Sequence, residues 1–163
     1  MNNRNVAVEI NRSENTKKER CRKMDKKLSR LGIFVFFDPQ GIVDEYVIRL
    51  LQSFRDRISR MVVVSNTVLN DTEREKLERN SDALYIRENS GLDAAAFKAG
   101  MVTFCGWEEV EKYDEAVLIN DTFFGPVHSF SDMFDEMAEK DIDFWGMSAG
   151  YPSDDGWNKV KYG

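Results

Sequence analysis

The feature that most constrains the fold of this chain is a series of five short apolar runs, each followed by polar or small residues. The runs span residues 31–37, 61–64, 83–86, 116–119 and 144–147. Their near-continuous apolar character predicts strands that are covered on both faces, as in a mostly parallel sheet. The carboxyl ends of parallel strands share one edge of a sheet, where the crevice for a ligand opens. The sequence therefore predicts one site assembled from five separate stretches.

Four helical patterns separate these runs. Apolar residues at three- and four-residue spacing predict a helix over residues 43–58 with one face on a core. Capping residues and turns predict three more helices, over residues 71–79, over residues 92–105, and from Ser129 or Ser131 to about Lys140. The alternation of strand and helix predicts an α/β fold, with a three-layer, doubly wound and mostly parallel sheet and right-handed crossovers.

Charge divides the chain into a basic tail and an acidic body. Ten Lys or Arg against four Asp or Glu give residues 1–30 a net charge of +6, which leaves −12 for residues 31–163 of the total of −6. We expect one α/β domain over residues 31–150, between the basic tail and a polar C-terminal tail over residues 151–163. The basic tail could contact an anionic membrane surface, nucleic acid or the acidic body of its own chain, or it could form a solvated, partly helical lead-in. The acidic body argues against a nucleic-acid partner.

The sequence also bears on location. It has no apolar stretch long enough to span a membrane, and its N-terminus lacks the apolar core of a signal peptide. Its two cysteines, Cys21 and Cys105, are not near a histidine or second cysteine at metal spacing, and a reduced compartment fits them best. These features predict a cytoplasmic protein, with the basic tail as a means of peripheral attachment to the inner face of the membrane.

The densest group of polar and small residues at the end of a predicted strand lies in residues 87–93. Asn89 and Gly91 supply turn chemistry, and Asp93 falls in the first turn of the following helix. The Asp93 carboxylate could hydrogen-bond a sugar or ribose hydroxyl. The alternative is a capped turn in which this acid only complements the helix dipole. The glycine-rich motifs of dinucleotide-binding folds and of P-loops do not occur in the sequence.

A second polar group follows the strand predicted over residues 116–119. Asn120, Asp121 and Thr122 end that strand. The Asp121 carboxylate could hold Mg²⁺ or Mn²⁺, because these cations prefer oxygen ligands and share them with substrate phosphates. Asp after a strand is also a common turn former, so a purely structural role stays open.

Two further strand ends add candidate ligand-binding residues to the same rim. Asp38 follows the first predicted strand, and Ser65 and Asn66 follow the second. An aspartate at the end of the first strand, such as Asp38, also occurs in phosphatases of the haloacid type. The sequence Asp38-Pro39-Gln40 lacks the second aspartate two residues on, which argues against that class.

Taken in order, five segments of the chain resemble the rhamnan synthesis protein F family. They span residues 32–38, 62–66, 87–93, 118–126 and 143–147, and the longest motif is Leu-Ile-Asn-Asp-Thr-Phe-Phe-Gly-Pro. The resemblance covers roughly residues 30–150. Members of this family are bacterial glycosyltransferases of cell-surface polysaccharides such as lipopolysaccharide. The resemblance implies that this chain is the Rossmann-like, donor-binding half of an A-type glycosyltransferase fold.

The resemblance also implies ligands and site residues. The donor would be a nucleotide sugar such as dTDP-rhamnose, whose sugar passes to a growing glycan acceptor. Asn89, Gly91 and Asp93 match the family's asparagine-glycine-aspartate signature, and they are implied to line the donor site. Asn120 and Asp121 stand where related enzymes keep an aspartate-rich motif for metal and diphosphate. Thr122 stands where serine is usual and retains the hydroxyl.

Two functional hypotheses from different classes follow. The first is a glycosyltransferase, most simply a rhamnosyltransferase, of cell-surface polysaccharide biosynthesis, or its donor-binding half. The second is a non-catalytic α/β module that binds a nucleotide sugar or a protein partner. The family continues into an acceptor-binding half that supplies the catalytic base, and the sequence identifies no catalytic residue here. His128, close to the rim, could bind phosphate or the acceptor, with surface or loop packing as the alternative, and Trp145 at a strand end could stack on a sugar.

Overall fold

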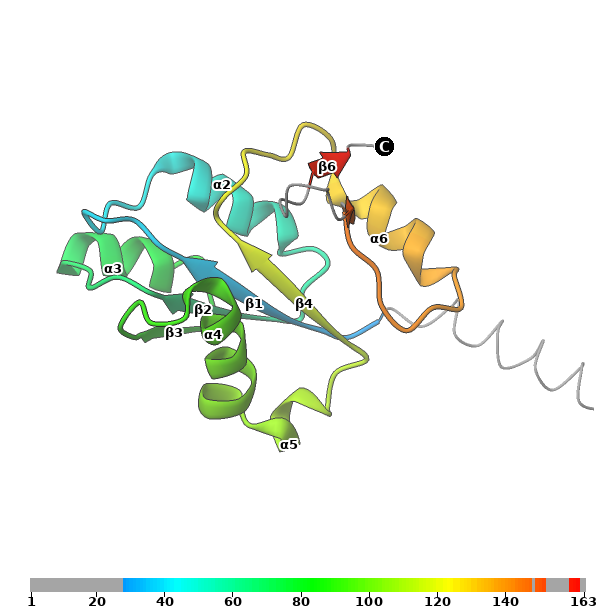
Figure 1. Ribbon diagram of the computed structural model, residues 1–163, viewed down its shortest axis with the longest axis horizontal. Helices are drawn as coiled ribbons and strands as arrows, with labels where there is room; N and C mark the ends of the chain where they lie inside the picture. Colours follow the sequence, from blue (N-terminus) through cyan, green and yellow to red (C-terminus); the bar gives the residue numbers. More distant parts are fainter. Residues whose placement is uncertain (1–27, 148, 152–158, 162–163) are drawn as a thin grey trace, which may run out of the picture.

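A four-stranded, all-parallel sheet forms the centre of the molecule in the computed structural model, which describes residues 28–147, 149–151 and 159–161 (Figure 1). Its strands stand in the order β3-β2-β1-β4, so β1 and β2 are central and β3 and β4 lie at the edges. The bounds are Arg30–Phe36 for β1, Arg60–Ser65 for β2, Ala83–Ile86 for β3 and Glu115–Asn120 for β4. The predicted α/β fold with a parallel sheet is confirmed.

Helices cover both faces of this sheet. Figure 1 shows α2 and α6 on one side of the strands, and α4 and α5 on the other. The helices are α2 (Glu45–Phe54), α3 (Asp71–Glu78), α4 (Leu92–Lys98), the π-helix η1 (Ala99–Cys105), α5 (Trp107–Val110) and α6 (Phe130–Ala138). The three predicted layers are therefore present.

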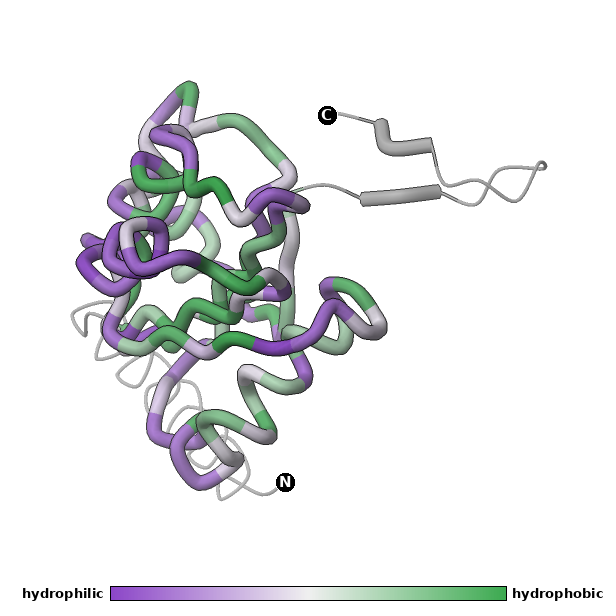
Figure 2. The backbone as a smooth tube through the Cα atoms, turned by 90° about the vertical axis from the view of Figure 1, so that its left-hand side faces the viewer, coloured by the Kyte–Doolittle hydropathy of each residue, from purple (hydrophilic) through white to green (hydrophobic). Residues whose placement is uncertain are grey.

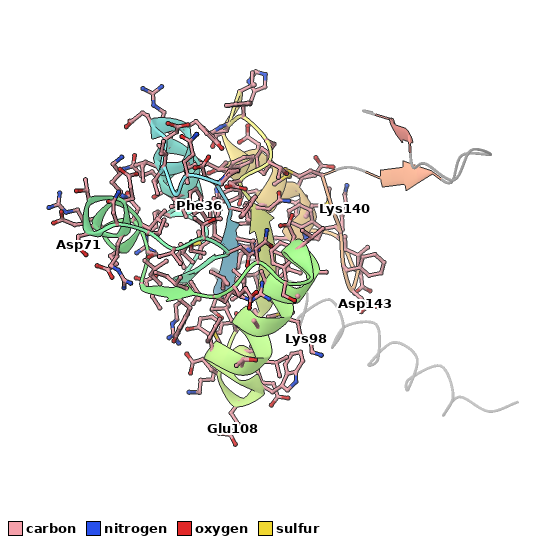
Figure 3. All side chains as sticks on the ribbon, turned by 60° about the vertical axis from the view of Figure 1, so that its left-hand side comes forward. Phe36, Asp71, Lys98, Glu108, Lys140 and Asp143 are labelled. Carbon is pink, nitrogen blue, oxygen red and sulfur yellow. The ribbon has the colours of Figure 1, made fainter. Side chains whose placement is uncertain are left out.

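Each face of the sheet has its own apolar core. Alternate residues of a strand point to opposite faces, so Phe34 and Phe36 of β1 enter one core and Ile33 and Val35 the other. The core with Phe34 is closed by α2, α3 and α6, and the core with Ile33 is closed by α4 and η1. Figure 2 shows the most hydrophilic stretches of the chain at the outside of the body. Figure 3 likewise shows Phe36 inside the body and Asp71 at its outside.

Helix α2 lies within the predicted span of 43–58. Its apolar residues Val47, Leu50, Leu51 and Phe54 recur at helical spacing, and all four are buried. Phe54 stacks on Phe130 of α6 with ring centroids 4.3 Å apart. The two helices that cover this face are thus joined to each other as well as to the sheet.

The helix predicted over residues 92–105 changes its winding at residue 99, where α4 gives way to the π-helix η1. Gly100 is fully buried at this point. A Cβ atom at residue 100 would lie 2.6 Å from Cγ2 of Ile33 and 3.2 Å from Cγ2 of Val64. Phe104 stacks on Tyr85 of β3 with ring centroids 4.3 Å apart. The missing side chain at residue 100 therefore lets this helix approach the sheet closely.

The prediction of a fifth strand over residues 144–147 was wrong. The structure shows no strand there, and Phe144 is 89% exposed. Trp145 instead packs edge-on against Phe134 of α6, with ring centroids 5.5 Å apart. A strand needs a neighbouring backbone to pair with as well as apolar residues, and these four residues pair with no strand of the described sheet.

A second, two-stranded sheet was not predicted. Strand β5 (Ala149–Tyr151) pairs with β6 (Lys159–Lys161) in antiparallel fashion. Most of the basic tail, including Cys21, and most of the polar C-terminal tail lie outside the described residues. No helix in the described part of the chain is long and apolar enough to cross a membrane.

Candidate functional site

The carboxyl ends of β1 and β4 lie side by side at the point where the strand order reverses. The chain builds β1, β2 and β3 outward in one direction and then returns to place β4 on the other side of β1. In parallel α/β sheets, ligands bind outside the carboxyl ends of the strands at such a point. Phe37 and Asp38 follow β1 here. Asn120 is the last residue of β4, and Asp121 follows it.

Asp121 is the most buried acid at this position, with 8% of its surface exposed. The backbone N–H of Phe37 donates a hydrogen bond to Oδ2 of Asp121 over 3.0 Å. Burial raises the pKa of Asp121 above its usual range, and the charges of Asp93 and Asp38 raise it further, against backbone hydrogen bonds that lower it. Ionised Asp121 is therefore stabilised by any cation that reaches this rim.

The two polar groups that were predicted separately are in contact. Nδ2 of Asn120 donates a hydrogen bond to Oδ2 of Asp93 over 2.8 Å. Asn120 ends β4 and Asp93 lies in the first turn of α4, after β3, so this bond joins the ends of two strands that β2 and β1 separate in the sheet. Because Asp93 also acts electrostatically on Asp121, three predicted site residues form one cluster.

The turn before α4 depends on Gly91. This residue has φ of 76°, in the left-handed region that favours glycine, and a Cβ atom here would lie 2.7 Å from Cβ of Ala95. Leu92 follows with φ of 52°, an uncommon conformation for a residue with a bulky side chain. Two consecutive left-handed residues thus direct the chain into α4 and set the position of Asp93.

The Asp38 side chain accepts hydrogen bonds from the backbone of the loop that follows β1. Its Oδ1 accepts hydrogen bonds from the backbone N–H groups of Gln40 and Ile42, both over 2.9 Å. Its backbone oxygen accepts another from Oγ1 of Thr67 over 2.8 Å. Asp38 therefore shapes the loop between β1 and α2, and it contributes negative charge to the surroundings of Asp121.

Ser65 and Asn66 are both buried at the end of β2. The Ser65 hydroxyl exchanges hydrogen bonds with the backbone of Thr67, over 2.7 and 3.2 Å. Oδ1 of Asn66 accepts a bond of 2.6 Å from Nη1 of Arg87, whose Nη2 donates over 2.6 Å to the backbone oxygen of Ser90. Within the described residues, Nδ2 of Asn66 and Oδ1 of Asn89 are buried without a partner. Ser65 thus shapes the loop after β2, and Asn66 supports, through Arg87, the loop that carries Asn89 and Gly91.

Three residues of the rim had no role in the sequence interpretation, namely Tyr46, Arg87 and Phe124. Tyr46 lies in α2, and its ring is 4.7 Å from that of Phe124. Burial raises the pKa of Tyr46, and the charges of Asp121, Asp44 and Asp38 add to the rise. Helical spacing explains Tyr46 as a core residue and does not show its distance from the strand ends, so no sequence signal could have found it.

The other candidates lie away from the cluster or at its border. Thr122 and His128 are exposed, and Trp145 packs on α6 as described above. A cavity of about 550 Å³ lies between the start of α2 and α3, and none of the nine predicted site residues lines it.

Mg²⁺ and Mn²⁺ prefer oxygen ligands, which the Asp121 carboxylate offers. No three His, Cys, Asp or Glu side chains among the described residues are arranged to hold a metal ion by themselves. These cations are commonly bound through one or two carboxylates together with substrate phosphates and water. Asp121, with the charges of Asp93 and Asp38 nearby, fits that kind of shared site.

The sequence of this chain matches the model of one known protein family. The family model for rhamnan synthesis protein F matches residues 61–159, more than half of the chain. The matched region begins at β2 and contains Asn66, Asn89, Asp93, Asn120 and Asp121, whereas β1 and Asp38 precede it. No curated protein and no solved structure matches the chain significantly. The chain therefore belongs to the rhamnan synthesis protein F family, and with it to polysaccharide synthesis.

Proposed function

We propose that the chain is a glycosyltransferase of cell-surface polysaccharide biosynthesis that binds a nucleotide-sugar donor at the carboxyl ends of its strands. Membership of a family named for the synthesis of a rhamnose polymer supports dTDP-rhamnose as the donor and rhamnosyl transfer to a glycan as the reaction. The single observation that carries the proposal is the position of Asp121. A buried, hydrogen-bonded carboxylate lies where the strand order reverses, next to Asp93 and Asn120.

In such a transfer the acceptor hydroxyl attacks the anomeric carbon of the donor sugar while the bond to the diphosphate breaks. A divalent cation would supply positive charge to the departing diphosphate. Asp121 would hold that cation, and its burial strengthens the electrostatic interaction between them. The hydrogen bond from the N–H of Phe37 fixes the carboxylate before the ligand arrives.

The other members of the cluster would bind and orient the donor. Asp93 can accept hydrogen bonds from sugar or ribose hydroxyls with the oxygen lone pairs that Asn120 leaves free. Gly91 lets the backbone approach the ligand without a side chain between them. Arg87 holds the loop between Asn66 and Ser90, which keeps Asn89 and Gly91 at the rim.

The partners of this activity are proposals of the same kind. The glycan acceptor would approach the donor from the solvent side of the rim. A cytoplasmic location, with residues 1–30 on an anionic inner membrane surface, agrees with the basic charge of that tail.

Calorimetry tests donor binding. Titration of the chain with dTDP-rhamnose, UDP-sugars and GDP-sugars, each with and without Mn²⁺, is expected to give the tightest binding for the dTDP sugar and weaker binding after chelation. If no nucleotide binds even at millimolar concentration, the donor site is absent. If neither a chelator nor Asp121→Ala weakens nucleotide binding, the proposed donor site stands and the proposed metal site fails.

A second candidate function is a non-catalytic module that binds a nucleotide sugar. It is favoured by the hydrogen bonds of Asp38, Ser65 and Asn66, which serve the chain's own loops. A radiolabelled dTDP-rhamnose assay with a rhamnose-containing acceptor separates the two. Transfer of label supports the glycosyltransferase, whereas donor binding without transfer or hydrolysis supports the module.

A further inference from the structure

The rim that carries Asp93, Asn120 and Asp121 also carries exposed apolar side chains. Each segment that follows a parallel strand carries at least one large apolar residue that is exposed. They are Phe37 and Ile42 after β1, Val68 after β2, Leu92 at the start of α4, and Phe124 after β4. A rim that combines a buried carboxylate with exposed apolar groups suits a ligand that is charged at one end and apolar at another. A nucleoside diphosphate, bound through a cation, is such a ligand.

Phe124 is the most exposed aromatic residue of this rim, with 81% of its surface open. It lies three residues after Asp121, in the loop that rises beyond the end of β4 beside α2 (Figure 1). Its ring contacts that of Tyr46 at a centroid distance of 4.7 Å and an interplanar angle of 50°. Tyr46 is held in α2, so it supports Phe124 from the body of the protein and leaves most of the Phe124 ring free.

Tyr46 is also linked electrostatically to Asp121. Asp121 contributes to the raised pKa of Tyr46, which means that the Tyr46 hydroxyl lies within the field of that carboxylate. Three residues of extended chain span at most about 11 Å, which limits the distance between Asp121 and Phe124. A ligand whose phosphates are bound at Asp121 therefore extends within reach of the Phe124 ring.

We propose that Phe124, supported by Tyr46, is the surface on which the base of the donor nucleotide stacks. This inference rests on the proposed function. A planar base gains more from an exposed aromatic ring than a sugar does, because both partners present flat π-faces. Such stacking contributes about 5- to 150-fold to affinity.

The experiment compares three ligands by calorimetry in the presence of Mn²⁺, namely dTDP, dTDP-rhamnose and inorganic pyrophosphate. Phe124→Leu keeps an apolar side chain and removes the ring, whereas Phe124→Trp keeps a ring. Val127→Ala is the matched control, because Val127 is 88% exposed in the same loop and has no ring. Circular dichroism of each variant checks that the fold is retained, which the exposure of these positions favours.

We expect Phe124→Leu to weaken dTDP and dTDP-rhamnose by the same factor, about 5- to 150-fold, and to leave pyrophosphate unchanged. Phe124→Trp and Val127→Ala should bind all three ligands as the original chain does. Loss for dTDP-rhamnose alone would show that the ring holds the sugar, and would overturn the proposal. Equal loss for pyrophosphate would overturn it as well, since the loop around Asp121 would then be disturbed. If the original chain binds nucleotides and Phe124→Leu binds them equally well, stacking fails and the donor site stands. If the original chain binds none of the three, the donor site itself fails.

Discussion

Asp121 lies where its charge is unfavourable for the fold. Burial and the neighbouring acids Asp93 and Asp38 hold its pKa above the ordinary value of 3.8. The folded state therefore binds a proton at Asp121 more tightly than the unfolded state does, and ionisation destabilises the fold. This destabilisation is fully present above the folded pKa and disappears below 3.8.

Asp121→Asn is expected to stabilise the protein at pH 7, because the amide oxygen can still accept the hydrogen bond from Phe37 and carries no charge. Each kcal/mol gained would raise the melting temperature by about 2–4 °C. The gain should shrink as the pH falls towards 3.8, while donor binding is lost at every pH. Thermal melts across this pH range check the prediction, with the exposed Asp56→Asn as control. A variant less stable than the original chain at pH 7 would contradict it.

Asp93 offers a second test at the scale of single residues. Asp93→Asn removes a charge near Asp121 and weakens the hydrogen bond from Asn120, so these two effects on stability oppose each other. We expect a change of less than about 1 kcal/mol in the free energy of unfolding, together with a clear loss of donor affinity. Glu88→Gln, which changes an exposed acid in the loop before α4, should change neither. If Asp93→Asn lowers the melting temperature with unchanged affinity, its carboxylate serves the helix only.

For single residues, the sequence predicted which side chains share the rim, but it did not predict the hydrogen bonds that they form. The carboxyl ends of parallel strands share one edge of a sheet, so a common rim for Asn120 and Asp93 was predictable. The hydrogen bonds of Asp38 and Asp121 to backbone N–H groups were not, because they depend on loop conformation. Tyr46 lies at the rim, in contact with Phe124, although the sequence pattern assigns its face of α2 to the core.

Among the elements, the continuous helical unit formed by α4 and η1 depends most on one residue. Gly100→Ala would place a Cβ atom 2.6 Å from Ile33, in the centre of the core. Overpacking of this kind typically costs about 1–3 kcal/mol. Chemical denaturation should show that loss for Gly100→Ala and almost none for Thr103→Ala, an exposed position in the same helix. Unchanged stability of Gly100→Ala would mean that the helix moves outward freely.

The sequence interpretation was least accurate where an apolar run does not belong to the main sheet. Residues 144–147 have the composition of a buried strand, and composition alone does not distinguish a strand from an extended segment whose one large ring is packed. Trp145 provides that packing on Phe134. The sequence also did not predict the change from α4 to η1. An α-helix and a π-helix can each place apolar side chains of this segment against the sheet, so the apolar pattern does not distinguish them.

For the whole molecule, the outer edge of β4 is the most exposed part of the main sheet on the α4 side. Leu118 is 48% exposed, whereas its pairing partner Ile33 in β1 is fully buried. Beyond β4, no further strand pairs with this edge in the part of the chain that the structure describes. Open strand edges with apolar side chains promote association between chains.

Leu118→Lys is therefore expected to reduce self-association at high protein concentration, because a lysine at an open edge opposes strand pairing. Its effect on stability should be small, since the side chain is already half exposed. Sedimentation velocity over a range of concentrations measures the effect, with Val68→Lys as a control, because Val68 is exposed in the loop after β2. Equal association of the Leu118→Lys variant and the original chain would contradict this prediction.

The order of the strands, β3-β2-β1-β4, has a consequence for how the protein folds. Arg30 and Ser59 are 29 residues apart and join the starts of β1 and β2, whereas Arg30 and Glu115 are 85 residues apart and join β1 to β4. Contacts between distant residues form slowly, because a longer loop must close first. We therefore expect β1, β2 and β3 to assemble early and β4 to dock last and open first. Hydrogen exchange should then find slower exchange in β2 than in β4, and a bound donor should slow exchange in β4 most. Asn120 and Asp121 would reach the rim only in this final step, so partly folded chains would have a central sheet and no working site.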